Sequence, residues 1–164
     1  MDRCGDDSKA GYDADFYAWT QDQAAKLRAA AASGSNLPVD WENLAEEIES
    51  VGRSDYRALE SFLAVVVEHL LKLEYSPVEP PRAGWARSVR HGRRSVEKLL
   101  RDSPSLRRRL DEALIDAWSA AVDGAYQGLL ADQVPADALP ETCPYTVEQA
   151  VGPDWLPVNR HGIN

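Results

Sequence analysis

The stretch of sequence that decides the fold is Trp41–Tyr75, WENLAEEIESVGRSDYRALESFLAVVVEHLLKLEY. Its apolar residues recur every three or four positions, the spacing that places side chains on one face of an α-helix. They are Trp41, Leu44, Ile48, Val51, Leu59, Phe62, Val66, Leu70 and Leu73. Gly52 and Asp55 interrupt this pattern, because glycine costs about 1 kcal/mol inside a helix and an apolar residue is expected at position 55. We therefore predict an amphipathic helix that is either one long element or an element kinked or briefly broken near Gly52.

Three further main helices are expected around this one. Asp13 or Asp15 can cap a first helix that ends near residue 32. A third helix should run from about Trp85 to Arg101, with apolar residues on one side and basic residues on the other. The pair Ser103-Pro104 is a typical helix start, with serine as cap and proline at the first helical position, and the fourth helix should continue to about residue 130.

The C-terminal region after Pro135 is rich in proline and predicts short elements only, although Thr146 to Gln149 matches a capping box. The expected fold is all-α, with four main helices in an up-and-down-like bundle and a proline-rich C-terminal strap. Tyr145, Trp155 and Leu156 should pack this strap against the helices. The predicted boundaries are a flexible N-terminal tail at 1–11, a single helical domain at 12–157 and a C-terminal tail at 158–164.

The composition excludes several classes of protein. The chain has 164 residues, about the size of one domain, and 44% of them are hydrophobic. Its longest aliphatic run, Leu63–Val67, is far shorter than a membrane-spanning segment, and no apolar segment follows Met1, so we expect a cytoplasmic protein without a membrane partner. Cys4 and Cys143 make neither a disulfide framework nor a zinc site, and we expect no cofactor.

Charge is distributed unevenly along this acidic chain, whose net charge is -9. Ten basic and two acidic residues lie between Arg82 and Arg109, whereas ten acidic and three basic residues lie between Asp40 and Glu79. The expected basic face of the third helix consists of Arg87, Arg90, Arg94, Lys98 and Arg101. Most such faces are solvated or paired within the molecule, here with the acids upstream, but this one could also bind a protein partner or a nucleic acid.

One group of polar side chains on the long helix could carry chemistry. Glu46 and Glu49 share a flank of the helix and, joined by His69, could ligate a divalent metal or act in acid–base catalysis. The alternative is a structural polar network of Glu49, Arg53 and His69. In this network Arg53, Arg57 or an arginine between Arg82 and Arg109 would neutralise a partly buried carboxylate. No nucleophile elbow, phosphate-binding glycine loop or zinc-protease motif accompanies these residues.

Five blocks in order along the chain resemble a known family. They are Tyr12–Thr20 (YDADFYAWT), Asn43–Ser54 (NLAEEIESVGRS), His69–Lys72 (HLLK), Asp102–Leu106 (DSPSL) and Cys143–Gln149 (CPYTVEQ). Together they are similar to the bacterial domain-of-unknown-function family twenty-nine. The resemblance covers nearly the whole chain and implies a small, almost entirely helical bacterial protein. It brings no established activity and no agreed catalytic residues.

The functional hypothesis that we favour is therefore a non-catalytic helical module for protein–protein interaction or self-association. A metal-dependent or acid–base enzyme using Glu46, Glu49 and His69 is one alternative. Nucleic-acid binding through the basic face between Arg87 and Arg101 is the other, and the acidic net charge disfavours it.

Overall fold

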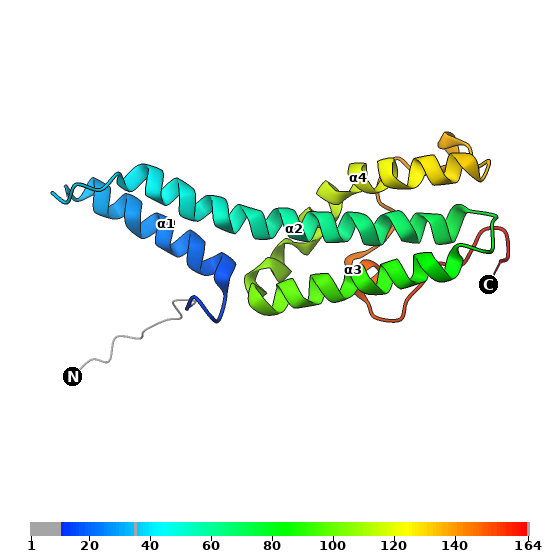
Figure 1. Cartoon of the computed structure of the whole chain (residues 1–164), viewed down its shortest axis with the longest axis horizontal. Coiled ribbons are helices and arrows are strands. Elements are labelled where there is room, and N and C mark those ends of the chain that lie inside the picture. The colour runs from blue at the N-terminus through cyan, green and yellow to red at the C-terminus, as the bar shows by residue number, and fades with distance from the viewer. Residues whose placement is uncertain (1–10, 35, 164) are drawn as a thin grey trace. The chain divides into compact units, whose positions relative to one another are not determined.

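The computed structural model describes residues 11–34 and 36–163, and the regular structure of this part of the chain is entirely helical (Figure 1). The main helices are α1 (Phe16–Ala32), α2 (Trp41–Tyr75), α3 (Arg82–Asp102) and α4 (Leu110–Ala131). The short elements are the 3-10 helices Pro104–Arg109 and Ala136–Ala138 and the helix α5 (Val147–Val151). The prediction of an all-α fold with four main helices is confirmed.

The helices form two compact units. Unit 1 contains the described residues up to Arg57 together with Leu99–Arg107, and unit 2 contains Ala58–Lys98 and the chain from Arg108 onward. Both α2 and α3 thus contribute one part to each unit. No helix in the described part of the chain has the length and apolar character needed to cross a membrane.

In unit 1, α1 packs against the first half of α2 at Gly52. Asp15, one of the two predicted caps, caps α1, since its carboxylate accepts a hydrogen bond from the Ala18 N–H at 2.9 Å. A Cβ atom at position 52 would lie only 2.2 Å from Thr20 Oγ1. The helix runs through Gly52 without a break, so the long helix, one of the predicted alternatives, is the one that forms. This glycine serves close packing of two helices.

The start of α3 differs from its prediction by three residues. The helix begins at Arg82, because the Pro81 carbonyl accepts hydrogen bonds from the N–H groups of Gly84 at 2.9 Å and Trp85 at 3.1 Å. A proline is well suited to a helix start, where its missing N–H has no helical partner to lose.

The start of α4 differs as well, and it is later than predicted, whereas that of α3 is earlier. The residues after Ser103 form a 3-10 helix, and the α-helix begins at Leu110. Ser103 does not cap this helix with its hydroxyl group, which accepts a hydrogen bond from the Tyr17 N–H at 3.2 Å and donates one to Asp55 at 2.8 Å. The hydroxyl thereby ties the end of α3 to α1 and α2 within unit 1.

The core of unit 2 consists of the second half of α2, α3 and α4. The α2 side chains of this core are fully or almost fully buried: Leu59, Leu63, Val66, Val67, Leu70 and Leu71. Small residues allow the neighbouring helices to approach closely, since a Cβ atom at Gly92 of α3 would lie 2.6 Å from Val66, and one at Gly124 of α4 would lie 2.5 Å from Glu68. A buried stripe of alanines along α4, from Ala113 to Ala125, serves the same purpose.

The C-terminal strap is held on unit 2 mainly by Arg93. This side chain is only 6% exposed. Its guanidinium group donates hydrogen bonds to four carbonyl groups of the strap, those of Gln149, Ala150, Pro153 and Trp155. Burial lowers the pKa of Arg93 from its ordinary value, and the charge of Asp154 opposes this effect.

The strap ends on the last turn of α2. The Asn159 side chain is buried and donates hydrogen bonds to the carbonyl groups of Leu73 at 2.8 Å and Ser76 at 2.9 Å. Tyr145 is buried and packs edge-on against Trp155, whereas Leu156 is 41% exposed, so the prediction that Leu156 packs against the helices is wrong. Its neighbour Trp155 takes the inward position.

Candidate functional site

Glu49, the central residue of the predicted site, lies in an ion-pair network of unit 1. Both of its carboxylate oxygens accept hydrogen bonds from the Arg28 guanidinium group, at 2.8 and 2.9 Å. Arg28 also donates to Glu42 at 3.0 Å, and Arg53 lies 3.6 Å from Glu49. The bidentate contact with Arg28 is the main reason why the pKa of Glu49 is lowered from its ordinary value.

The main partner of Glu49 was not among the arginines expected from the sequence. The candidates were Arg53, Arg57 and the arginines between Arg82 and Arg109, whereas the bidentate partner is Arg28 of α1. Arg28 lies in α1, and the sequence does not specify which face of α2 this helix packs against. Its distance of 21 positions from Glu49 along the chain gives no local signal of the contact.

The other two candidate residues lie apart from this ion-pair network. Glu46 is exposed on α2. His69 belongs to the part of α2 in unit 2, and its Nδ1 atom lies 2.8 Å from the carbonyl oxygen of Val65 in the preceding turn. Within residues 11–34 and 36–163, no three His, Cys, Asp or Glu side chains are grouped closely enough to hold a metal ion. The structure thus joins Glu49 with Arg53 and gives Glu46 and His69 other surroundings.

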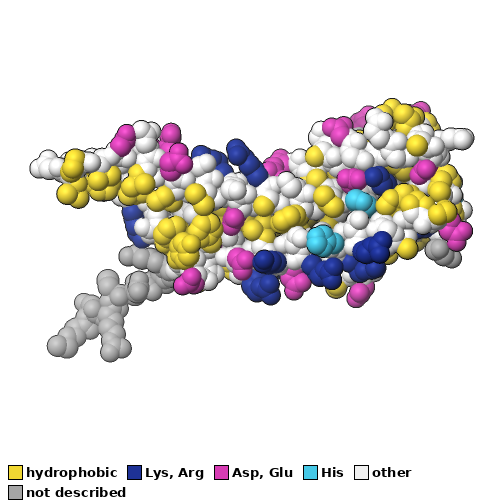
Figure 2. All heavy atoms as spheres, viewed as in Figure 1, with side chains coloured by type: hydrophobic (Ala, Val, Ile, Leu, Met, Phe, Trp, Pro, Cys, Tyr) yellow, Lys and Arg dark blue, Asp and Glu magenta, His cyan; other side chains and the backbone are white. Residues whose placement is uncertain are grey.

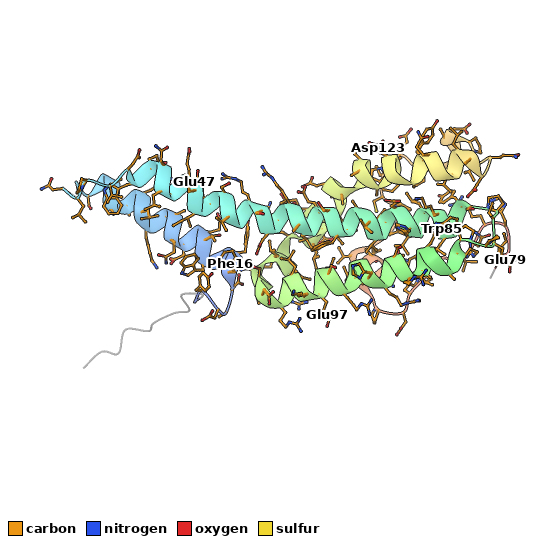
Figure 3. The ribbon with its side chains drawn as sticks, in the orientation of Figure 1. Phe16, Glu47, Glu79, Trp85, Glu97 and Asp123 are labelled. Carbon is orange, nitrogen blue, oxygen red and sulfur yellow. The ribbon has the colours of Figure 1, made fainter. Side chains whose placement is uncertain are left out.

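The basic face of α3 is exposed to solvent. Its members are Arg87, Arg90, Arg94, Lys98 and Arg101, of which the first four lie in unit 2 and Arg101 lies in unit 1. Figure 2 shows basic side chains gathered over α3, and Glu97 projects from the same helix (Figure 3). Among the described residues none of these five cations takes part in an ion pair, so the expected pairing with upstream acids is wrong.

Four of the ten upstream acids pair with other bases, Glu74 with Arg160 among them, and the described residues show no ion pair between these acids and the basic face. Glu42 and Glu49 bind Arg28, and Glu68 binds Lys72 at 2.6 Å. On its opposite side α3 presents Val89, Val96 and Leu100, all buried, so the helix turns its cations away from the core.

A groove in unit 1 gathers carboxylates and aromatic rings. This acidic groove has a volume of about 420 Å³ and is lined by Tyr12, Asp13, Phe16, Asp55, Leu99 and Asp102. Tyr12 makes edge-on contacts with Phe16 and Trp19, with ring centroids 5.3 and 5.0 Å apart. Asp55 accepts the hydrogen bond from Ser103, and none of the three carboxylates forms an ion pair with a described residue.

Sequence reasoning missed the acidic groove because its carboxylates come from three distant segments. They are brought together by hydrogen bonds of the Asp102–Leu106 segment to α1 and α2. Besides the Ser103 contacts, the Asp15 carboxylate accepts hydrogen bonds from the N–H group of Ser105 at 2.6 Å and from its hydroxyl group at 2.8 Å. Two of the sequence blocks that resemble the family, Tyr12–Thr20 and Asp102–Leu106, contribute to this groove. Their resemblance to the family was the sequence signal that could have indicated the groove.

Comparisons with known proteins agree with the resemblance. A family model described as "Domain of unknown function DUF29" matches residues 12–156. A crystal structure of an α-helical protein of unknown function from Rhodospirillum rubrum has 30% sequence identity and a TM-score of 0.73. The similarity covers 90% of this chain and 93% of that chain. No curated protein matches the chain.

Proposed function

The chain belongs to the DUF29 family of unknown function, and we propose that it is a non-catalytic helical module that binds other proteins through the basic face of α3. The observation that carries this proposal is the exposed row formed by Arg87, Arg90 and Arg94, which have no acidic partner among the described residues. An acidic surface of a partner protein would supply the missing counter-charges.

The geometry of α3 suits a binding surface. Val89, Val96 and Leu100 anchor the helix in the interior, and Arg93 ties it to the strap through four carbonyl groups. The backbone that carries the cations is therefore held rigidly, and only the ends of the side chains must be ordered on binding. A rigid surface of this kind loses less conformational entropy when a partner docks.

The state of the glutamates supports this proposal more than it supports catalysis. A general base works best when its pKa is near the working pH. Glu49 has a lowered pKa and accepts two hydrogen bonds from Arg28, so it is a stable anion whose oxygens are engaged. An ion pair of this type stabilises the packing of α1 on α2.

A nucleic acid is a less suitable partner than a protein. The net charge of -9 repels a polyanion at long range, and Glu97 stands on α3 near the cations that would follow a phosphate backbone. A protein partner can place its carboxylates opposite the cations and avoid Glu97.

The test compares charge reversals at two exposed places. R90E/R94E reverses the basic face, and R107E/R108E makes the same change in charge on exposed residues of the 3-10 helix Pro104–Arg109. Tagged wild-type and variant proteins are used to recover partners from an extract of the source cells, with quantitative mass spectrometry. Mixed-sequence DNA and RNA are tested in parallel by gel shift at physiological salt.

We expect specific protein partners, or copies of the chain itself, that R90E/R94E loses and R107E/R108E retains. Equal recovery with both variants would refute the basic face as the binding surface. A nucleic-acid shift that R90E/R94E abolishes would replace the proposal with nucleic-acid binding.

A further inference from the structure

We propose that the partner of the basic face is a second copy of this chain, whose acidic groove in unit 1 receives an arginine of α3. This inference rests on the proposed function and identifies the partner. It joins two surfaces that each lack counter-charges: the cations of the basic face, and the carboxylates of the groove lined by Asp13, Asp55 and Asp102.

The groove has the chemistry that a guanidinium group requires. Guanidinium is planar, stacks on aromatic rings and donates paired hydrogen bonds to carboxylates. Tyr12 is 58% exposed, and Phe16, at the beginning of α1, lines the same groove (Figure 3). A cation above such rings gains a further attraction to their faces.

The carboxylates of the groove are partly held in position before binding. Ser103 donates to Oδ2 of Asp55 at 2.8 Å, which orients this carboxylate and leaves Oδ1 able to accept another hydrogen bond. Asp102 is the last residue of α3 and Asp13 lies just before α1, so three separate segments surround the space. A pre-arranged set of acceptors binds a cation with less loss of entropy.

The donor side offers arginines at the spacing of one helical face. Arg87, Arg90 and Arg94 are three and four positions apart, so their side chains project from the same side of α3. One of them can enter the groove while its neighbours face the surrounding acids. The two surfaces occur on every molecule at equal concentration, and their charges are opposite, which favours a second copy over an unrelated acidic protein.

The resulting contact would be heterologous, because one copy contributes its groove and the other its basic face. Such contacts use different surfaces on the two copies and leave one of each surface unfilled in a dimer. Association should therefore increase with concentration and decrease with salt.

Unit 2 contains a second acidic groove that provides a matched control. It has a volume of about 520 Å³, and its lining includes Trp118, Asp123, Asp137 and Glu141. It offers one aromatic ring, whose N–H group already donates to the Glu141 carbonyl at 3.0 Å. We assign the arginine to the groove of unit 1 because that groove presents two rings of its own with a third, Trp19, packed against them.

The test is analytical ultracentrifugation of the full chain over a range of concentrations, in low and physiological salt. The groove variant is D13K/D102K, the face variant is R90E/R94E, and the control is D123K/D137K in the second groove. Circular dichroism shows whether each variant keeps its helical content. The decisive sample is an equimolar mixture of the groove variant and the face variant, in which each protein retains one intact surface.

We expect wild type and D123K/D137K to associate, and each of the other two variants to associate at least tenfold more weakly. The mixture should recover association, because one pair of intact surfaces remains and the two reversed surfaces also carry opposite charges. This recovery also shows that both variants are folded.

Three results would overturn the inference: a monomeric wild type at the highest soluble concentration in low salt, loss of association in D123K/D137K, or no association in the mixture. The first leaves the proposed function intact if the extract experiment still yields a protein partner that R90E/R94E loses. Failure of that experiment as well, with no self-association, would remove both proposals.

Discussion

Replacing Gly52 with alanine tests whether this glycine is a packing residue. A Cβ atom at position 52 would lie 2.2 Å from Thr20 Oγ1, 3.3 Å from Thr20 Cβ and 3.1 Å from Gln21 Nε2. Thr20 is fully buried, and its hydroxyl group donates to the Tyr17 carbonyl at 2.8 Å, so it cannot move away freely. Inserting a methyl group into a packed interior costs about 1–3 kcal/mol, whereas replacing glycine with alanine inside a helix gains about 1 kcal/mol.

We therefore expect G52A to lower the free energy of unfolding by up to about 2 kcal/mol, the difference between these two effects. The measurement is urea-induced unfolding followed by far-UV circular dichroism. G84A is the matched control, because the nearest atom to a Cβ at that helical position is an Arg87 nitrogen 4.0 Å away. It should leave stability unchanged or raise it by up to about 1 kcal/mol.

A double-mutant cycle with T20A locates the cause of the effect. Removing the Thr20 hydroxyl gives the new methyl group room, so G52A should cost at least about 1 kcal/mol less in the T20A background than in the wild type. An equal cost in both backgrounds would refute the packing argument. A gain in stability for G52A similar to that for G84A would also refute it.

Three further predictions concern the strap and the ion pair. R93M keeps a long side chain but removes the four hydrogen bonds to carbonyl groups. It should lower the free energy of unfolding, measured in urea, by about 2–4 kcal/mol. A loss below about 1 kcal/mol would contradict the role of Arg93. N159D replaces an amide donor with an acceptor facing the Leu73 carbonyl, and should reduce the melting temperature more than N159A does; the reverse order would refute the donor assignment. Because the pKa of Glu49 is lowered in the folded state, its ionised carboxylate contributes its full stabilisation at pH values above the unfolded pKa of about 4.3. This contribution is lost as the pH falls through the folded pKa. E49Q should therefore lose less stability than wild type when the pH is lowered through this range, as measured by thermal unfolding. If the two proteins lose stability in parallel, Arg28 does not stabilise the fold through the charge of Glu49.

The helices themselves could be predicted from local patterns. The capping box at Thr146 and Gln149 was correct, and Asp15 was one of the two predicted caps of α1, because each cap depends on a side chain within three residues of the backbone it binds. The apolar spacing also defined the buried side of α3 and of the second half of α2, whereas Leu44 and Val51 on the predicted face of the first half of α2 are 42% and 48% exposed. Local signals failed at Ser103, where a distant carboxylate and a distant N–H group bind the hydroxyl that was expected to cap a helix.

The candidate site was less predictable than the helices. Glu49 was correctly expected to be paired, since a partly buried carboxylate requires a counter-charge. Its main partner, Arg28, depends on how α1 folds back on α2, and helical spacing does not specify that contact. The same holds for the acidic groove, whose three carboxylates are contributed by residues 13, 55 and 102.

The amino-acid sequence by itself determined that this protein is helical, where most helices begin and end, and that its charges are segregated, because these properties depend on residues close together in the chain. Tertiary structure decided which charges neutralise one another. Arg28 pairs with Glu42 and Glu49 and Lys72 pairs with Glu68, whereas the cations of α3 that were expected to pair with acids of α2 remain exposed. The tertiary structure also explains Gly52, which looked like a helix breaker in the sequence. It lies where α1 contacts α2, and α1 leaves no room for a side chain there.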